Sequence, residues 1–414
     1  MNFTLGMPRR IYFGAGLIHK IDDHALPLGR RFLLVLSRTI ARDTKIDEAL
    51  RAQLTGHQAA CATVTSSGEP TVQDVDDAVI VARSFQADCV IGIGGGSALD
   101  LAKAVAAIAP QPVQGLQKPA LPAGPGNALR DLSVQDYLEG VGIGAPLVNP
   151  PLPTVLAPTT AGTGSEATRN SVIASPEKAF KKSLRSDRMF ADVALIDPEL
   201  CRSCPRSVVA QSGLDALTQL IEPYISRGAN PLTDALIAAT LPKAARALPI
   251  AWRDPIGADP HIWDALCTGS LAGGVALTNA GLGAVHGFAA ALGAKYPIAH
   301  GLICAALLAP TLEANRNALA AIDANHAGLE RIGQVGRWLA GRDDLTRDQG
   351  ITHAIDAIRA LVAEFQIPNL ADLGVKREDY PFLVAEARTG SSMKFNPVPL
   401  NDQQLEWILE KARG

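Results

Sequence analysis

The sequence has few aromatic residues, no excess of positive charge and few cysteines. Aromatic residues make up 5% of the 414 residues, and 38 Lys and Arg stand against 41 Asp and Glu, giving a net charge of −3. Without a basic excess the chain is poorly suited to neutralise phosphates, so we do not expect nucleic-acid binding. Six cysteines are too few for a disulfide framework in a chain of this length.

Long apolar runs are also missing. No stretch of about 20 uncharged apolar residues occurs, as a membrane-spanning helix requires, and no apolar segment typical of a signal peptide is visible near Met1. We therefore expect a cytoplasmic protein that does not bind membranes. Hydrophobic residues make up 47% and charged residues 19%, a balance typical of a folded globular chain.

The first half of the chain alternates short apolar runs with helical patterns. Strands that alternate with helices in this way predict a parallel sheet covered on both faces. A long Pro- and Gly-rich connection, 111–127, is predicted to be functional or mobile. The runs typical of buried strands are 32–36, 60–64, 89–93, 154–157 and 193–196.

The pattern changes after Asp197-Pro198. From about Ser207 onward, Ala- and Leu-rich helical periodicity replaces the strand pattern. Chains that change in this way normally form two domains. We predict an α/β domain over residues 1–203 and an all-helical domain over residues 204–414.

A glycine-rich segment, GGGSALDLAK at 94–103, follows a predicted strand and opens a helix. Gly94, Gly95 and Gly96 would let backbone N–H groups approach a pyrophosphate, and Ser97 could cap a helix whose N-terminus favours anionic oxygens. A turn without a ligand is the alternative, because the spacing differs from the GxGxxG dinucleotide fingerprint.

A second polar segment, PTTAGTGSE at 158–166, also follows a predicted strand. Its hydroxyl and amide groups suit contacts with ribose, amide and phosphate groups, although an exposed polar loop would have the same composition. Two such segments after strands of one sheet favour a shared nucleotide crevice at the carboxyl ends of the strands.

The third group lies in the helical half. Asp215 and Gln219 are four residues apart, which places both side chains on one helix face. His286 and His300 are each followed by Gly. Two imidazoles and one carboxylate match the set that holds non-haem Fe(II), although a histidine is more often structural than a ligand.

These motifs occur in an order and spacing that resemble the iron-containing (group III) alcohol dehydrogenase family, from Arg10 to Leu400. The resemblance implies a dehydroquinate synthase-like fold, with an N-terminal dinucleotide-binding domain and a C-terminal helical domain for metal and substrate. It implies an NAD(P)-dependent alcohol dehydrogenase, or aldehyde or ketone reductase, in which Fe(II) or Zn(II) assists hydride transfer. It also implies a homodimer or larger assembly, and the runs 3–5 and 11–13 could pair across subunits.

The resemblance also implies roles for individual residues. Asp215, Gln219, His286 and His300 would occupy the metal-ligand positions, and the Asp and both His would be catalytic. Twelve further residues would contact the pyrophosphate, the nicotinamide half or the riboses of the cofactor. They are Ser37, Arg38, Gly94, Gly95, Gly96, Ser97, Asp100, Thr159, Thr160, Thr163, Ser165 and Lys181.

Three positions depart from the family's usual pattern. Gln219 stands where a His ligand is usual, so we predict a labile metal. Ala290 stands where a His is proposed to relay a proton, so the proton would come through water or a ribose hydroxyl. Ser37 replaces an Asp that bonds ribose hydroxyls, and Arg38 could pair with a 2′-phosphate, so NADPH should serve at least as well as NADH.

Three alternatives remain open at this point. One is a metal-independent reductase resembling maleylacetate reductase. Another is a dehydroquinate-synthase-like lyase, whose phosphate-bearing substrate would require several Lys and Arg, which are scarce around Asp215, His286 and His300. The third is a protein that binds nucleotide without turnover.

Overall fold

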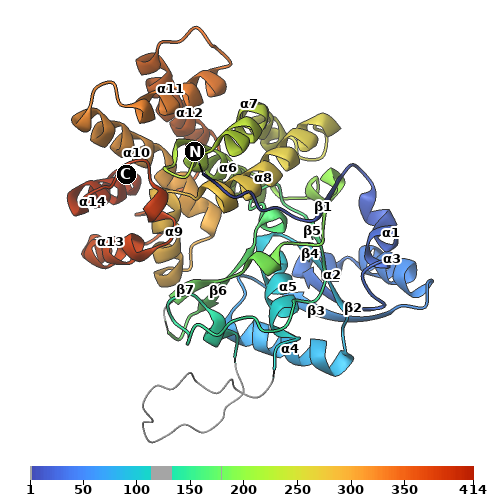
Figure 1. Ribbon diagram of the computed structural model, residues 1–414. Coiled ribbons are helices and arrows are strands. Elements are labelled where there is room, and N and C mark those ends of the chain that lie inside the picture. Colours follow the sequence, from blue (N-terminus) through green and yellow to red (C-terminus); the bar gives the residue numbers. More distant parts are fainter. Residues whose placement is uncertain (1, 113–132, 179) are drawn as a thin grey trace, which may run out of the picture. The chain divides into compact units, whose positions relative to one another are not determined.

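A computed structural model of the chain describes residues 2–112, 133–178 and 180–414 (Figure 1). Nearly all of the predicted connection 111–127 lies outside these residues. The chain forms two compact units. Unit 1 comprises Met1–Gly6, Thr159–Ala167 and Pro198–Gly414, and unit 2 comprises Met7–Pro158 and Thr168–Asp197.

Unit 2 is built on a six-stranded sheet in which every pairing is parallel, as the alternating pattern predicted. The residues Phe32 to Leu36 have no exposed surface, because helices cover both faces of the sheet. In spatial order the strands are β1 (Arg10–Phe13), β8 (Val193–Ile196), β5 (Thr154–Pro158), β4 (Cys89–Gly94), β2 (Arg31–Ser37) and β3 (Ala60–Ser66).

The order of the strands fixes a switch point in the sheet. The chain passes from β2 to its neighbour β3, and then returns so that β4 lies on the other side of β2. In open parallel sheets, ligands bind outside the carboxyl ends of the strands at such a point. Here the two flanking strands end at Ser37 and Gly94.

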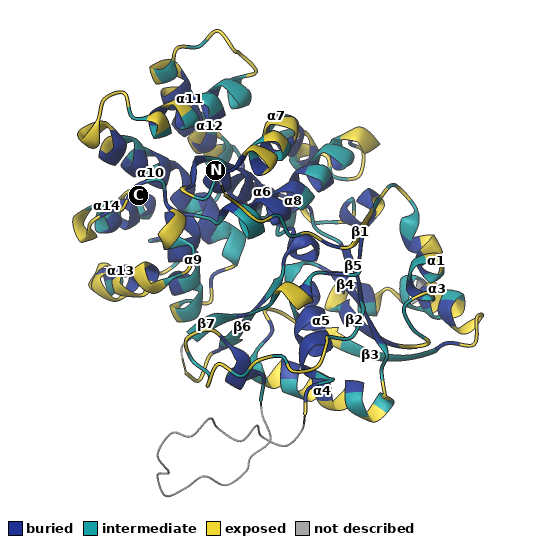
Figure 2. Ribbon diagram, viewed as in Figure 1, coloured by how far each residue is buried: buried dark blue, intermediate teal, exposed yellow. Residues whose placement is uncertain are grey.

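The helices of unit 2 pack on this sheet. The α5 helix is buried over most of its length, whereas α4 keeps an exposed outer face (Figure 2). An antiparallel hairpin of β6 (Asn170–Ser175) and β7 (Phe180–Arg185) lies beside α5 and was not predicted. The helices are α1 (Ile21–Ala25), α2 (Arg38–Arg42), α3 (Thr44–Thr55), α4 (Val72–Phe85) and α5 (Gly96–Ile108).

Unit 1 is helical, as the change of pattern after residue 207 predicted. The α6 helix is its centre and packs on α7, α8 and α10. The helices are α6 (Arg206–Ile225), α7 (Pro231–Arg253), α8 (Pro260–Ala280), α9 (Ala284–Lys295), α10 (His300–Ile322), α11 (Ala327–Ala340), α12 (Arg347–Glu364), α13 (Tyr380–Thr389) and α14 (Asp402–Arg413). No single helix in the described ranges is long and apolar enough to cross a bilayer. The α8 and α9 helices meet the length and composition only as a pair, bent by 98°.

The polar segment 159–167 packs against the helices of unit 1. Gly164 has a φ of +57°, and a Cβ there would lie 2.5 Å from the carbonyl oxygen of Ser270 and 2.6 Å from the amide nitrogen of Gly274. Only glycine allows the segment to approach α8 this closely. The division into domains at residue 203 stays a prediction.

Candidate active site

Three of the four predicted metal ligands meet inside unit 1. Asp215 comes from α6, His286 from the first turn of α9 and His300 from the start of α10. Oδ1 of Asp215 lies 3.4 Å from Nε2 of His286 and 3.7 Å from Nε2 of His300. Side chains far apart in the sequence thus point their ligand atoms at one small volume.

Cys304 joins this group, although it was not predicted. Its Sγ lies 3.6 Å from Nε2 of His300 and 3.9 Å from Nε2 of His286. One ligand atom from each of Asp215, His286, His300 and Cys304 lies within 4.8 Å of all the others. The spacing of four residues between His300 and Cys304 on one helix was the available signal.

Gln219 reaches the group through Asp215. Its Nε2 donates a hydrogen bond of 2.9 Å to Oδ2 of Asp215. Its Oε1 is buried and has no hydrogen-bond partner among the described residues. The amide therefore holds the carboxylate with Oδ1 turned toward the imidazoles.

Glu222 orients His286 and was also missed. Its Oε2 lies 2.7 Å from Nδ1 of His286, and its Oε1 accepts a 2.8 Å hydrogen bond from the backbone N–H of Val285. A carboxylate bonded to one nitrogen of a histidine ring fixes the direction of the other nitrogen. Here Nε2 of His286 is directed toward Asp215. Glu222 lies seven residues after Asp215 on the same face of α6, which was the signal for it.

The buried charges of the group shift its pKa values. Burial alone would raise the pKa of Asp215, but His300 and His286 lower it to about 2. Burial lowers the pKa of His286, yet Cys304, Asp215 and Glu222 together raise it well above its usual range. Burial raises the pKa of Cys304 to about 12. The site thus favours positive charge among buried carboxylates.

These residues fit a divalent cation. Asp215 and Glu222 are each 2% exposed, and their ion pairs within the described parts of the chain are with histidines alone. Oδ1 of Asp215 has no hydrogen-bond partner among those residues. Buried polar atoms are almost always satisfied, and a metal ion would satisfy this oxygen together with the imidazoles.

The predicted cofactor residues of unit 2 meet at the switch point of the sheet. A Cβ at Gly94 would lie 2.7 Å from Cβ of both Ser37 and Ala98, so only glycine lets β4, α5 and the end of β2 come together. The prediction that Ser97 caps the helix is wrong. The α5 helix begins two residues earlier than predicted, with Gly95 at the cap and no side-chain cap bond.

Ser37 and Arg38 lie where β2 passes into α2. Oγ of Ser37 accepts a 3.4 Å hydrogen bond from the N–H of Ile40, which caps this short helix. Arg38 is exposed, and no hydrogen bond or ion pair joins it to another residue in the described ranges. Its guanidinium group is therefore available to a ligand.

Two other predicted cofactor residues make contacts within the protein. Oδ2 of Asp100 accepts a 2.9 Å hydrogen bond from the N–H of Val172, and its Oδ1 lies 3.1 Å from Nζ of Lys103. Nζ of Lys181 pairs with Oε1 of Glu69. Both residues hold the β6–β7 hairpin, and their contacts with cofactor stay predictions.

The predicted residues Thr159, Thr160, Thr163 and Ser165 belong to unit 1. Oγ1 of Thr163 accepts a 3.3 Å hydrogen bond from the N–H of Ser165. The segment begins directly after Pro158, which pairs with Gly94 at the end of the sheet. Their contacts with cofactor also stay predictions.

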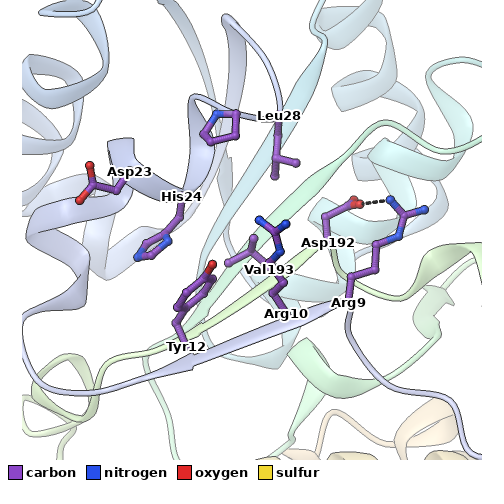
Figure 3. Close-up of a pocket in the computed structure, with 9 residues that line it drawn as sticks. Arg9, Arg10, Tyr12, Asp23, His24, Leu28, Asp192 and Val193 are labelled. Atoms are coloured by element: carbon purple, nitrogen blue, oxygen red, sulfur yellow. Dashed lines mark hydrogen bonds and ion pairs between the residues drawn. The ribbon is translucent and has the colours of Figure 1, made fainter.

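A cavity of about 240 Å³ lies elsewhere in unit 2, beside β1 and α1 (Figure 3). The rings of Tyr12 and His24 lie there with centroids 4.1 Å apart and planes tilted by 36°, and Arg9 pairs with Asp192 at 2.8 Å. None of the residues predicted from the sequence to form the site lines this cavity.

Comparisons with known proteins cover nearly the whole chain. The model of the family described as iron-containing alcohol dehydrogenase matches residues 8–198, and that of its C-terminal domain matches residues 209–413. The probable alcohol dehydrogenase EutG of Escherichia coli is 31% identical over 412 residues, which cover 99% of this chain and 94% of that protein.

Solved structures agree with this assignment. A crystal structure of 1,3-propanediol oxidoreductase has a TM-score of 0.86 and 29% identity, with all of both chains covered. Sulfoacetaldehyde reductase from Bifidobacterium kashiwanohense, in complex with NAD+, has a TM-score of 0.82 and 26% identity, covering 100% of this chain and 99% of that one. The parallel sheet and the helical unit agree with these matches, and the chain belongs to the iron-containing alcohol dehydrogenase family, oxidoreductases of dehydroquinate synthase-like fold that act on CH–OH groups.

Proposed function

We propose that this chain is an NAD(P)-dependent alcohol dehydrogenase that reduces small aldehydes or ketones when reduced cofactor is plentiful. The observation that carries the proposal is the group of Asp215, His286 and His300, in which Asp215 and His286 are buried and His300 is partly exposed. Its carboxylate oxygen and two imidazole nitrogens lie 3.4 and 3.7 Å apart, and they suit Fe(II) or Zn(II).

The residues of the site have distinct tasks in this proposal. When bound, the nicotinamide exchanges hydride with the substrate carbon, and the divalent ion polarises the substrate oxygen as a Lewis acid. Asp215, His286 and His300 hold the ion, Glu222 orients His286, and Gln219 orients Asp215. The side chain of Ala290 has no group that could relay a proton, so water or a ribose hydroxyl supplies the proton that the product alcohol needs.

The cofactor would bind outside the carboxyl ends of β2 and β4. Gly94, Gly95, Gly96 and Ser97 would lie along its pyrophosphate, since the start of α5 has no side-chain cap and offers backbone N–H groups. Ser37 and Arg38 would face a ribose and accept a 2′-phosphate. Asp100, Lys181, Thr159, Thr160, Thr163 and Ser165 would complete the site.

We also propose a homodimer or larger assembly. The β1 strand is an edge of the sheet, and β8 is its one strand partner among the described residues. Ile11 and Phe13 are 36% and 41% exposed on this strand. An edge with free backbone groups and apolar side chains readily pairs with a second copy.

Residues 1–203 would supply the cofactor domain and 204–414 the metal domain. The cytoplasmic location stays a prediction.

The test is a metal-dependent assay. Reduction of a panel of aldehydes and ketones, followed by NADPH and NADH absorbance, should stop with chelator and return with Fe(II) or Zn(II). His286→Ala should lose about 100-fold or more in kcat/KM, because Lewis-acid assistance is worth several kcal/mol.

The control is His261→Ala, whose imidazole is 90% exposed on α8 and should be dispensable. Full activity in His286→Ala would overturn the role of the metal and leave the metal-independent reductase as the better account. Absence of any nicotinamide-coupled turnover across the panel would overturn the proposed function itself.

A further inference from the structure

We propose that Cys304 is the fourth protein ligand of the divalent ion, supplying a thiolate where the family's usual pattern has a histidine at position 219. The inference rests on the metal site of the proposed function. It makes the ligand set one oxygen, two nitrogens and one sulfur, from Asp215, His286, His300 and Cys304.

The distances among the four atoms agree with coordination of one ion. Metal–nitrogen bonds of about 2.0–2.1 Å and metal–sulfur bonds of about 2.3 Å place neighbouring ligand atoms of a tetrahedron about 3.3–3.6 Å apart. The contacts of Asp215 Oδ1 with the two imidazole nitrogens are 3.4 and 3.7 Å, and those of Cys304 Sγ are 3.6 and 3.9 Å. Small inward movements bring the longer of these four contacts to such an edge, and all four ligand atoms lie within 4.8 Å of one another.

The geometry also separates Cys304 from Gln219. The Gln219 amide donates to Oδ2 of Asp215, and not to the Oδ1 that lies near both imidazoles, and so acts on a ligand. The Cys304 sulfur instead contacts both imidazole nitrogens that would bind the ion. The donor lost from α6 at position 219 is thus supplied by α10.

Burial holds the thiol in place. Cys304 has no exposed surface, and it lies one turn after His300 on the 23-residue helix α10. Two ligands four residues apart on one helix keep a fixed separation.

A thiolate beside imidazoles favours Zn²⁺ and Co²⁺ and disfavours Mg²⁺, Ca²⁺ and Mn²⁺, which prefer oxygen donors.

Cobalt tests the inference without relying on activity. Metal-free full-length protein is titrated with Co²⁺, and the near-ultraviolet absorption is recorded for a thiolate-to-cobalt charge-transfer band. We expect this band in the wild type and its loss in Cys304→Ser and Cys304→Ala. The affinity for Zn²⁺ should fall about tenfold or more in both variants, since even a residue that only supports a ligand is worth about 10–100-fold.

The matched control is Cys267→Ser, which removes another buried thiol of unit 1 whose Sγ contacts Cys201 and not the cluster. It should keep both the band and the affinity. Far-ultraviolet circular dichroism of the metal-free proteins checks folding. If a variant misfolds, the presence or absence of the charge-transfer band in the wild-type protein still tests the inference.

Two results would overturn the inference. Wild-type protein that binds Co²⁺ without a charge-transfer band has no thiolate ligand, and a band that survives in Cys304→Ser comes from another cysteine. Turnover of the panel is measured on the same preparations, so a metal-dependent reductase without the band disproves the thiolate ligand and leaves the proposed function intact.

Discussion

In the proposed function, Ser37 determines what the end of β2 offers to a dinucleotide. Its hydroxyl bonds to the backbone of α2, so no carboxylate is present at this position to bond ribose hydroxyls or repel a 2′-phosphate. Ser37→Asp should keep the helix cap, because Asp caps helices as well as Ser does. It should shift the NADH to NADPH ratio of kcat/KM toward NADH by about 10–100-fold, the effect of one or two charged hydrogen bonds.

The charge control for this change is Thr39→Asp, two residues along on the exposed start of α2. It should shift the ratio far less. Strong preference of the wild type for NADH would disprove the inference drawn from Ser37 and Arg38.

Gln219 is the residue whose replacement should strengthen metal binding. The change Gln219→His adds an imidazole nitrogen, a better donor to Fe(II) and Zn(II) than an amide oxygen. The time for which the protein retains metal during dialysis against chelator should lengthen by about tenfold or more. Gln403→His, on the exposed face of α14, controls for an added histidine. Retention no better than that of the control would show that position 219 cannot reach the ion.

At the scale of elements, the side chain of Glu222 joins α6 to the first turn of α9. Because it bonds both Nδ1 of His286 and the N–H of Val285, Glu222→Ala should lower the free energy of unfolding by about 1–3 kcal/mol. Glu222→Gln should recover most of the stability but still lose about 10–100-fold in metal affinity, because the negative charge of the carboxylate beside the imidazole of His286 is gone.

Isothermal titration with Zn²⁺ and thermal melting of the metal-free protein separate these two effects. A purely structural role would lower the melting temperature of Glu222→Ala and leave the metal affinity of Glu222→Gln unchanged. The exposed change Glu386→Gln on α13 should change neither quantity.

The long elements were predictable because burial leaves a pattern in the sequence, and a strand buried on both sides leaves an uninterrupted apolar run. The runs 32–36 and 89–93 are buried on both sides, and β2 and β4 extend them by one or two residues. The β6–β7 hairpin was missed because its second strand, FKKSLR, is mostly half-exposed and has no clear alternation. Helical spacing placed Cys304 on the face of His300 and Glu222 on the face of Asp215, but their role depends on contacts between α6, α9 and α10, which local sequence does not encode.

At the scale of the whole molecule, the edge of the sheet should decide the state of assembly. The double variant Ile11→Lys/Phe13→Lys places two charges on the outer face of β1, and charged edges oppose pairing between sheets. Light scattering at micromolar concentration should give a dimer or larger species for the wild type and a monomer for the variant. Ile80→Lys, at a 62% exposed position on α4, is the control for added charge. A monomeric wild type would end the proposal.

The two compact units share the chain in an interleaved way. The backbone passes from one unit to the other after Gly6, Pro158, Ala167 and Asp197. A single proteolytic cut near residue 203 therefore divides unit 1 between the two fragments, because the N-terminal fragment carries the segment 159–167 without the α8 helix against which Gly164 packs. The C-terminal half of this enzyme should resist separate expression, and a cut chain should stay together until unit 1 unfolds.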